Sequence, residues 1–217
     1  MVMLNAEYET IALQDLFLGM VRRLAPEVVL ELGCYRAEFS IACRRFLPHA
    51  AIHAFEANPH VYSRKKAKIE AAGVRCHHMA IGDAVRPVEF LVRTREGGDD
   101  LSRKKGSNSL RLRSFAAEYE RVDVPMVTVD HFAQEGDLLG RPCAMWIDLK
   151  GCAWEALIGA EAMLSTTMAL MVEVEDAEIW VGQRLAGDVD QLLTARGFKA
   201  VARDQEYPRQ HNVIYQR

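Results

Sequence analysis

The residues with the clearest chemical meaning are two carboxylates and a glycine in the first third of the chain. Glu31 lies in the apolar segment 28–32 and is followed by Gly33, while Glu56 directly follows a second apolar segment at 51–55. A glycine at the end of a strand lets the backbone approach a ligand closely. Glu56 lies 23 residues after Gly33, near the position where an acid accepts hydrogen bonds from the ribose hydroxyls in a doubly wound sheet. The spacing therefore predicts a nucleoside site.

The turn after Gly33 does not have the glycine pattern of a pyrophosphate-binding loop. Tyr35 and Glu38 occupy the later positions of G-x-G-x-x-G, and Glu31 would repel phosphate groups beside it. The same carboxylate suits a cationic group such as an amine or a sulfonium. Two acids and a glycine turn therefore favour S-adenosylmethionine over NAD as the ligand. An NAD-linked oxidoreductase remains an alternative, because one fold supports many functions.

A third carboxylate, Asp148, closes the predicted strand 144–147 at the same edge of the sheet. There it could act as a general base, orient a substrate hydroxyl or contact a cofactor amine. Alternatively, it caps the helix predicted to start near Trp154. Glu173 ends the next predicted strand and is a second candidate. The chain has no H-E-x-x-H or C-x-x-C spacing, so we expect no metal site.

These side chains must be positioned by strands that alternate with helices. Short apolar runs bounded by Pro or Gly predict buried strands, and apolar residues at three- and four-residue steps predict helices. The predicted strands are 28–32, 51–55, 74–79, 88–92, 122–129, 144–147 and 168–174, the helices are 6–24, 38–47, 60–72, 154–164 and 188–196, and a hairpin joins 198–202 and 212–215. This order predicts an α/β fold with a doubly wound, mostly parallel sheet of about seven strands, closed by the antiparallel hairpin.

The length of 217 residues predicts one domain at 28–217, preceded by a helical segment at 1–27. Segment 93–113 stands out inside it, because it carries seven basic and three acidic residues together with three glycines. It is either a solvated loop or a flexible basic insertion that covers an anionic or sugar-phosphate substrate.

The composition limits the classes of partner that we expect for this chain. A net charge of −3 argues against a globally basic nucleic-acid binder. The longest uncharged run, 162–172, has 11 residues and is too short to cross a bilayer. We therefore expect neither nucleic acid nor membrane as a partner. Five cysteines without a C-x-x-C pair favour a reducing, cytoplasmic compartment, and the oligomeric state stays open.

A series of motifs runs through the chain in a consistent order. They are Glu-Leu-Gly-x-x-x-Ala at 31–37, Phe-Glu-Ala-Asn-Pro at 55–59, Ala-Ile-Gly-Asp at 80–83, Gly-Ser-Asn-Ser-Leu at 106–110, Val-Thr-Val-Asp at 127–130, Trp-Ile-Asp-Leu-Lys-Gly at 146–151 and Asn-Val-Ile-Tyr at 212–215. From about residue 28 to its end, the chain resembles the FkbM-type family of class I S-adenosylmethionine-dependent methyltransferases. The resemblance implies a Rossmann-like fold and O-methylation of a hydroxyl on a sugar or natural-product small molecule.

The resemblance also implies cofactor contacts for individual residues. The methionine part of the cofactor would lie against Glu31, Gly33, Cys34 and Tyr35, the ribose against Glu56 and Asn58, and the adenine against Ala80, Ile81 and Asp83.

Two positions depart from the family pattern, since Lys150 replaces the usual Glu or Gln and Ala153 replaces the next acid. Lys150 could instead neutralise Asp148 or meet an acidic substrate. The departures leave a catalytically silent S-adenosylmethionine-binding scaffold as a further alternative.

Overall fold

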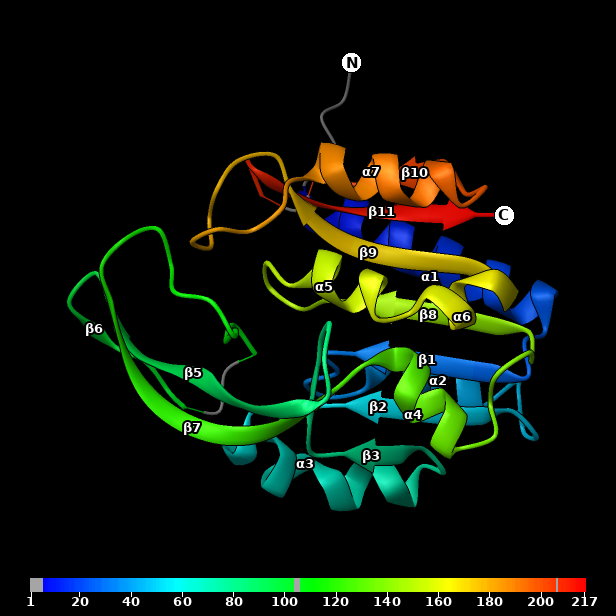
Figure 1. Ribbon diagram of the computed structural model, residues 1–217, viewed down its shortest axis with the longest axis horizontal. Helices are drawn as coiled ribbons and strands as arrows, with labels where there is room; N and C mark the ends of the chain where they lie inside the picture. Colours follow the sequence, from blue (N-terminus) through cyan, green and yellow to red (C-terminus); the bar gives the residue numbers. More distant parts are fainter. Residues whose placement is uncertain (1–5, 104–105, 206) are drawn as a thin grey trace.

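The computed structural model describes residues 6–103, 106–205 and 207–217, and a twisted sheet forms the centre of this part of the chain (Figure 1). Its seven strands lie in the order β3 (Arg75–His77), β2 (Ala51–Phe55), β1 (Val28–Leu32), β8 (Cys143–Ile147), β9 (Thr167–Glu175), β11 (Gln210–Gln216) and β10 (Lys199–Arg203). The first five are parallel, and β11 is antiparallel to both β9 and β10. The predicted α/β fold, with its doubly wound sheet and closing hairpin, is confirmed.

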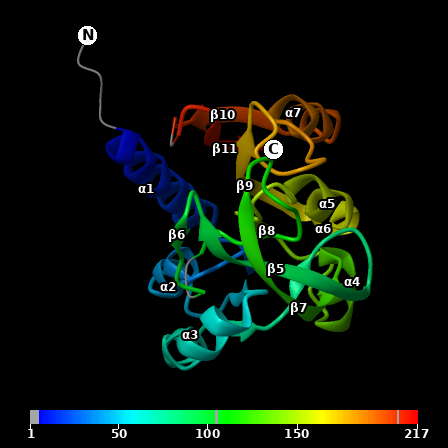
Figure 2. The ribbon, with the colours of Figure 1, turned by 90° about the vertical axis from the view of Figure 1, so that its left-hand side faces the viewer.

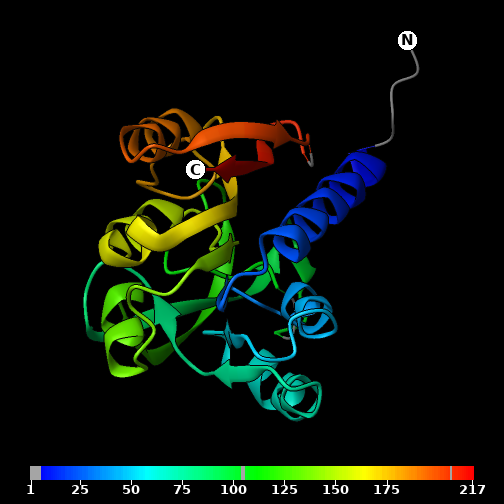
Figure 3. The same ribbon diagram turned by 90° about the vertical axis from the view of Figure 1, so that its right-hand side faces the viewer.

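Helices cover both faces of this sheet (Figure 3). One face carries α1 (Ala6–Leu24), α2 (Glu38–Arg44) and α3 (Pro59–Ala71), and the other carries α4 (Val129–Glu135), α5 (Ala153–Ile158), α6 (Glu161–Thr166) and α7 (Ala186–Ala195). Alternate residues of β1 enter the two cores, since Val28 and Leu30 pack on the α4–α7 side and Val29 on the other. Helix α1 shares the second core through Phe17 and Val21.

One predicted helix is divided and another helix was not predicted. The segment 154–164, predicted as one helix, is broken at Gly159, where an added Cβ would collide with the carbonyl oxygen of Gly82. The strand predicted over 122–129 ends at Val127, and helix α4 follows it. Thr128 caps α4, because its side chain accepts a hydrogen bond from the His131 N–H at 3.0 Å.

A second, four-stranded sheet lies beside the carboxyl ends of the central strands (Figures 1 and 2). Its order is β4 (Ala80–Ile81), β7 (Ala117–Val127), β5 (Arg86–Glu96) and β6 (Asp99–Asp100). The sequence predicts parts of β5 and β7 but not their separate sheet. Of the basic segment 93–113, the beginning belongs to β5 and β6, whereas Lys104 and Lys105 lie outside the described residues. None of the helices in the described ranges has the length and apolarity needed to span a bilayer.

A buried histidine on β2 gives the fold a pH dependence. His53 Nδ1 lies 3.0 Å from His77 Nε2, and the His53 ring packs edge-on against the ring of Phe132. Burial, and then the neighbouring His77 and arginines, lower the pKa of His53 to about 3. Below pH 6.5 the unfolded chain therefore binds a proton at His53, whereas the folded chain leaves this histidine neutral. The stabilisation is complete above pH 6.5 and falls by about 1.4 kcal/mol per pH unit as the pH decreases toward 3.

We expect His53→Phe to remove this slope. Between pH 6.5 and pH 4.5, denaturant titration should show the wild type losing about 2–3 kcal/mol of unfolding free energy relative to the variant. The exposed His49 provides the control, because His49→Phe should leave the slope unchanged. Parallel slopes for wild type and His53→Phe would contradict the assignment.

Candidate cofactor and substrate site

A cavity of about 890 Å³ lies at the carboxyl ends of β1, β2 and β8, where the second sheet covers them. Gly33, Glu56 and Asp148, which follow these three strands, all line it. This is the edge at which open α/β sheets bind ligands. The volume is in the range of small-molecule sites, roughly 300–1,000 Å³. The structure thus brings together the residues that the sequence analysis placed at separate strand ends.

The turn after β1 is held tightly against its neighbours. Gly33 has a φ of +82°, and an added Cβ would collide with the carbonyl oxygen of Asp148. Tyr35 has a φ of +47°, a conformation that costs a residue with a side chain of order 1–3 kcal/mol. Its N–H donates to Glu56 Oε2 at 3.0 Å. The strained turn therefore fixes the position of the Glu56 carboxylate.

Glu56 is buried, and each of its carboxylate oxygens accepts one backbone hydrogen bond. The Tyr35 N–H binds one oxygen, and the Asn58 N–H donates to the other at 2.8 Å. Burial raises the pKa of Glu56 to about 7, although the backbone N–H groups of Asn58, Tyr35 and Ala57 oppose the shift. A carboxylate has about four acceptor positions, so its oxygens can also accept from a ligand in the cavity. These acceptors fit the vicinal diol of a ribose.

Asp148, which lines the cavity, belongs to a cluster of charged side chains. Lys150 Nζ lies 2.7 Å from Asp148 Oδ1 and 2.6 Å from Glu173 Oε2. Burial lowers the pKa of Lys150, but the two carboxylates more than offset this effect, so its pKa is raised. Burial and the Asp148 charge raise the pKa of Glu173. Lys150 therefore stays protonated and pairs with Asp148, as the sequence analysis envisaged.

Ala80, Ile81 and Tyr35 also line the cavity, whereas other predicted cofactor residues lie outside its lining. The Glu31 carboxylate accepts a hydrogen bond from the Ser40 N–H at 2.8 Å, in the first turn of α2. Its pKa is raised to about 7 by burial. Cys34 is buried in the core beside Cys76, and Asp83 is exposed in a bend after β4.

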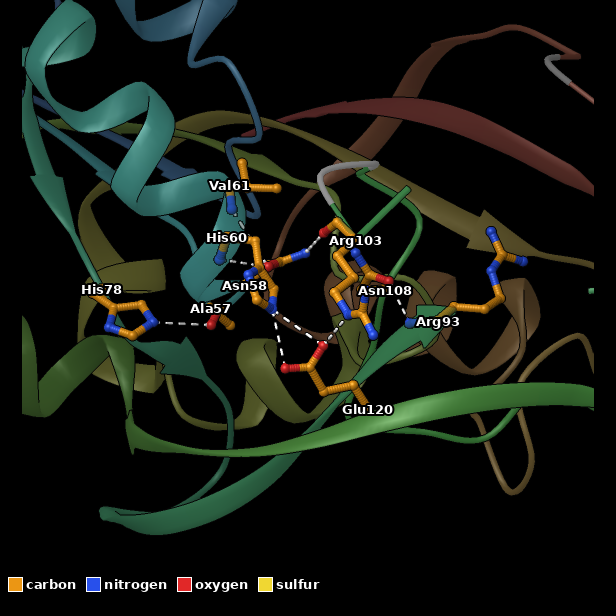
Figure 4. Close-up of polar contacts among 9 residues, drawn as sticks. All are labelled: Ala57, Asn58, His60, Val61, His78, Arg93, Arg103, Asn108 and Glu120. Atoms are coloured by element: carbon orange, nitrogen blue, oxygen red, sulfur yellow. Dashed lines mark hydrogen bonds and ion pairs between the residues drawn. The ribbon is translucent and has the colours of Figure 1, made fainter. Parts of the chain in front are cut away.

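Asn58 is not part of the cavity lining and forms polar contacts with two other segments of the chain (Figure 4). Its side-chain oxygen caps α3 by accepting from the His60 N–H at 2.9 Å, and its amide donates to the Arg103 carbonyl at 2.8 Å. Glu120 of β7 pairs with both His60 and Arg103. These contacts attach the loop after β6 to the start of α3, so Asn58 organises the loop that covers the site.

Residues from the second sheet and from two loops complete the cavity. Arg93 and Arg113, from the basic segment 93–113 that the sequence analysis considered as a cover over an anionic substrate, line it together with Trp180 from the loop after β9. Ser109 donates its hydroxyl to the Lys150 carbonyl at 2.7 Å and accepts from the Arg111 N–H at 3.0 Å. The Gly-Ser-Asn-Ser-Leu motif at 106–110 indicated Ser109, whereas the sequence analysis did not name Trp180.

The fold and this site together define a class I methyltransferase architecture, with the cofactor edge at the carboxyl ends of parallel strands. Residues 35–200 match the methyltransferase FkbM domain. The chain belongs to this family. Membership implies S-adenosylmethionine as the methyl donor, and the acceptor positions of Glu56 fit its ribose.

Individual proteins are also similar to this chain. The chain is 26% identical over 193 residues to the 2-O-methyltransferase NoeI of Sinorhizobium fredii (strain NBRC 101917 / NGR234), covering 84% of this chain and 75% of that protein. Among solved structures, it resembles the N-terminal domain of EvdMO1 in the presence of SAH and D-fucose, at 10% identity and a TM-score of 0.51, covering 93% and 80% of the two chains. The precorrin-6y C5,15-methyltransferase of Geobacter metallireducens GS-15 gives 14% identity and a TM-score of 0.48, covering 94% and 86%.

Proposed function

We propose that this chain methylates a hydroxyl oxygen of a sugar or natural-product small molecule, with S-adenosylmethionine as donor. The observation that carries the proposal is the Glu56 carboxylate, which lines the cavity, is held by the Tyr35 and Asn58 N–H groups and lies beside the strained turn at Tyr35. The name of the relative NoeI, a 2-O-methyltransferase, supports an oxygen acceptor. The fold neighbour with D-fucose supports a sugar.

The protein's own residues then have three tasks. Glu56 and the turn at Gly33 hold the nucleoside, while Ala80 and Ile81 border its base. When bound, S-adenosylmethionine supplies a methyl group that its sulfonium already activates. Holding the acceptor oxygen in line at ~3 Å supplies about 7–11 kcal/mol of the barrier reduction. Asp148 is the carboxylate placed to take the hydroxyl proton, because it lines the same cavity.

A catalytically silent cofactor-binding scaffold is the second candidate, and one contact favours it. Lys150 Nζ lies 2.7 Å from Asp148 Oδ1, so this oxygen is already paired with a cation. Such a scaffold would bind S-adenosylhomocysteine and form none of it from S-adenosylmethionine with any acceptor. Product formation therefore separates the two candidates.

Replacing Glu56 with alanine tests the cofactor site. Two hydrogen bonds to a charged group contribute about 1.5–3 kcal/mol each when buried, so we expect Glu56→Ala to weaken S-adenosylhomocysteine binding by about 100-fold in calorimetry. The exposed acid Glu89 gives a control, since Glu89→Ala should bind like the wild type.

A ligand comparison removes the effect of Glu56 on the turn itself. Wild type should bind adenosine about tenfold or more tightly than 2′,3′-dideoxyadenosine, and Glu56→Ala should bind the two alike. If the variant keeps wild-type affinity for S-adenosylhomocysteine, or the wild type does not bind it, the proposed function is wrong.

A further inference from the structure

The second sheet contributes two arginines to the wall of the cavity. Arg93 lies on β5, and Arg113 lies in the segment before β7. The Arg93 side chain is 8% exposed and that of Arg113 is 17% exposed. Removing a guanidinium from water is costly unless charge and hydrogen bonds compensate it. These two arginines, here called the arginine pair, therefore require an explanation.

One carboxylate serves both members of the arginine pair. Glu96 forms an ion pair with Arg93, and its Oε1 lies 3.7 Å from Arg113 Nη2. Neither Arg93 Nε nor Arg113 Nε has a hydrogen-bond partner among the described residues. The exposed Glu178 and Arg209 also line the cavity and carry opposite charges. The arginine pair therefore has one more positive charge than Glu96 balances, and its two Nε atoms are unused donors.

Aromatic rings hold the Arg113 guanidinium in place. It lies 4.5 Å from the ring centroid of the buried Trp180 and 4.6 Å from that of Phe115, both within the range of cation–π contact. Burial, followed by the nearby charge of Arg93, lowers the pKa of Arg113. In Figure 4 the Arg93 side chain extends away from the Asn58–Glu120 contacts. The arginine pair is thus positioned independently of the loop attachment at Asn58.

We propose that the arginine pair binds an anionic group, a carboxylate or a phosphate, on the methyl acceptor. The inference rests on the proposed function, because it assigns the acceptor of the same cavity. Planar guanidiniums bind both anions through paired hydrogen bonds, and the two unpartnered Nε atoms supply such donors. Lys150 does not compete for this role, since it is paired with Asp148 and Glu173.

Matched pairs of acceptor analogues test the proposal by calorimetry on the full chain saturated with S-adenosylhomocysteine. The first pair is 4-nitrophenyl β-D-glucuronide and 4-nitrophenyl β-D-glucoside, and the second is glucose 6-phosphate and glucose. We expect at least one anion to bind about tenfold or more tightly than its neutral partner. The pair that shows the preference distinguishes carboxylate from phosphate. Equal binding within both pairs overturns the proposal.

Variants test whether the arginine pair causes the preference for the anionic analogue. Arg113→Met should reduce it to about twofold or less while S-adenosylhomocysteine affinity stays within about twofold, and Arg93→Met at the same wall should act alike. Arg95, on the same strand but outside the cavity lining, is the control, and Arg95→Met should keep the preference. If either cavity variant melts like wild type but loses S-adenosylhomocysteine affinity tenfold, the arginines bind the cofactor and the proposal is wrong. Cofactor binding without an anion preference overturns this inference alone, whereas absent cofactor binding overturns the proposed function.

Discussion

Asp148→Asn is expected to lower kcat by about 10²- to 10⁴-fold, the usual contribution of a positioned general base. The amide keeps the shape of the carboxylate and can still accept a hydrogen bond from Lys150, which lies 2.7 Å away. It cannot accept the proton of an acceptor hydroxyl. Since Asp148 is not the residue that holds the nucleoside, S-adenosylhomocysteine affinity should stay within about threefold.

A single-turnover assay with bound S-adenosylmethionine measures the effect, using the most reactive of the four acceptor analogues named above. Asp123 is an exposed acid on β7, and Asp123→Asn should react at the wild-type rate. Wild-type chemistry in Asp148→Asn would show that Asp148 is not the base. A low rate together with weak cofactor binding would instead assign Asp148 to the cofactor.

The sequence predicts the cofactor edge well because the relevant signals are local. The apolar runs of β1 and β2 end at Gly33 and Glu56, and parallel strands bring their carboxyl ends to one edge. Asp148 joins them because β8 pairs with β1 on the other side. Each of these relations needs parallel strands, which the α/β alternation predicts; the order of the strands comes from the structure.

The acceptor side could not be predicted in this way. Segment 93–113 is rich in charge and glycine, which is typical of a solvated loop. In the structure, β5 and β7 pair along their length, and Arg113 forms a bridge with Trp180. That contact joins residues far apart in the sequence, so no local pattern indicates that the arginines are buried. The requirement for glycine at position 159, where α5 ends, has the same origin, because an added Cβ would collide with a distant backbone atom, the carbonyl oxygen of Gly82.

Glu31 shows how a local signal can allow two interpretations. An acid beside a glycine turn suits a sulfonium, yet the alternation of side chains along β1 also directs Glu31 to the face that carries Val29 and α2. Its hydrogen bond to the Ser40 N–H places a negative charge at the amino end of α2, where the helix dipole favours it. A contact between Glu31 and the cofactor stays a prediction.

Lys150→Met is expected to destabilise the fold by about 3–5 kcal/mol at pH 8, the usual effect of removing one partner from a buried ion pair. Lys150 is the cation that contacts both Asp148 and Glu173, and the Glu173 side chain is 2% exposed. Lys150 has a φ of +46°, and methionine in its place has the same backbone strain, so the substitution reports the charge. A glutamate, one of the two residues that are usual in the family at this position, would add to the repulsion between Asp148 and Glu173.

The pH dependence of this loss identifies its cause. Without Lys150, a charged Glu173 would be buried without a partner, so the folded variant favours the protonated form. The pKa of Glu173 in the folded state therefore rises further above its value in the unfolded chain. The folded variant then holds a proton that the unfolded chain releases, and its stability decreases as the pH rises. Denaturant titrations should therefore show a smaller deficit at pH 5.5 than at pH 8, and Lys150→Met combined with Glu173→Gln should recover part of it. Lys66 forms an exposed pair with Glu70, and Lys66→Met should leave the free energy of unfolding close to that of the wild type. A deficit independent of pH, unrelieved by Glu173→Gln, would show that Lys150 contributes packing rather than charge.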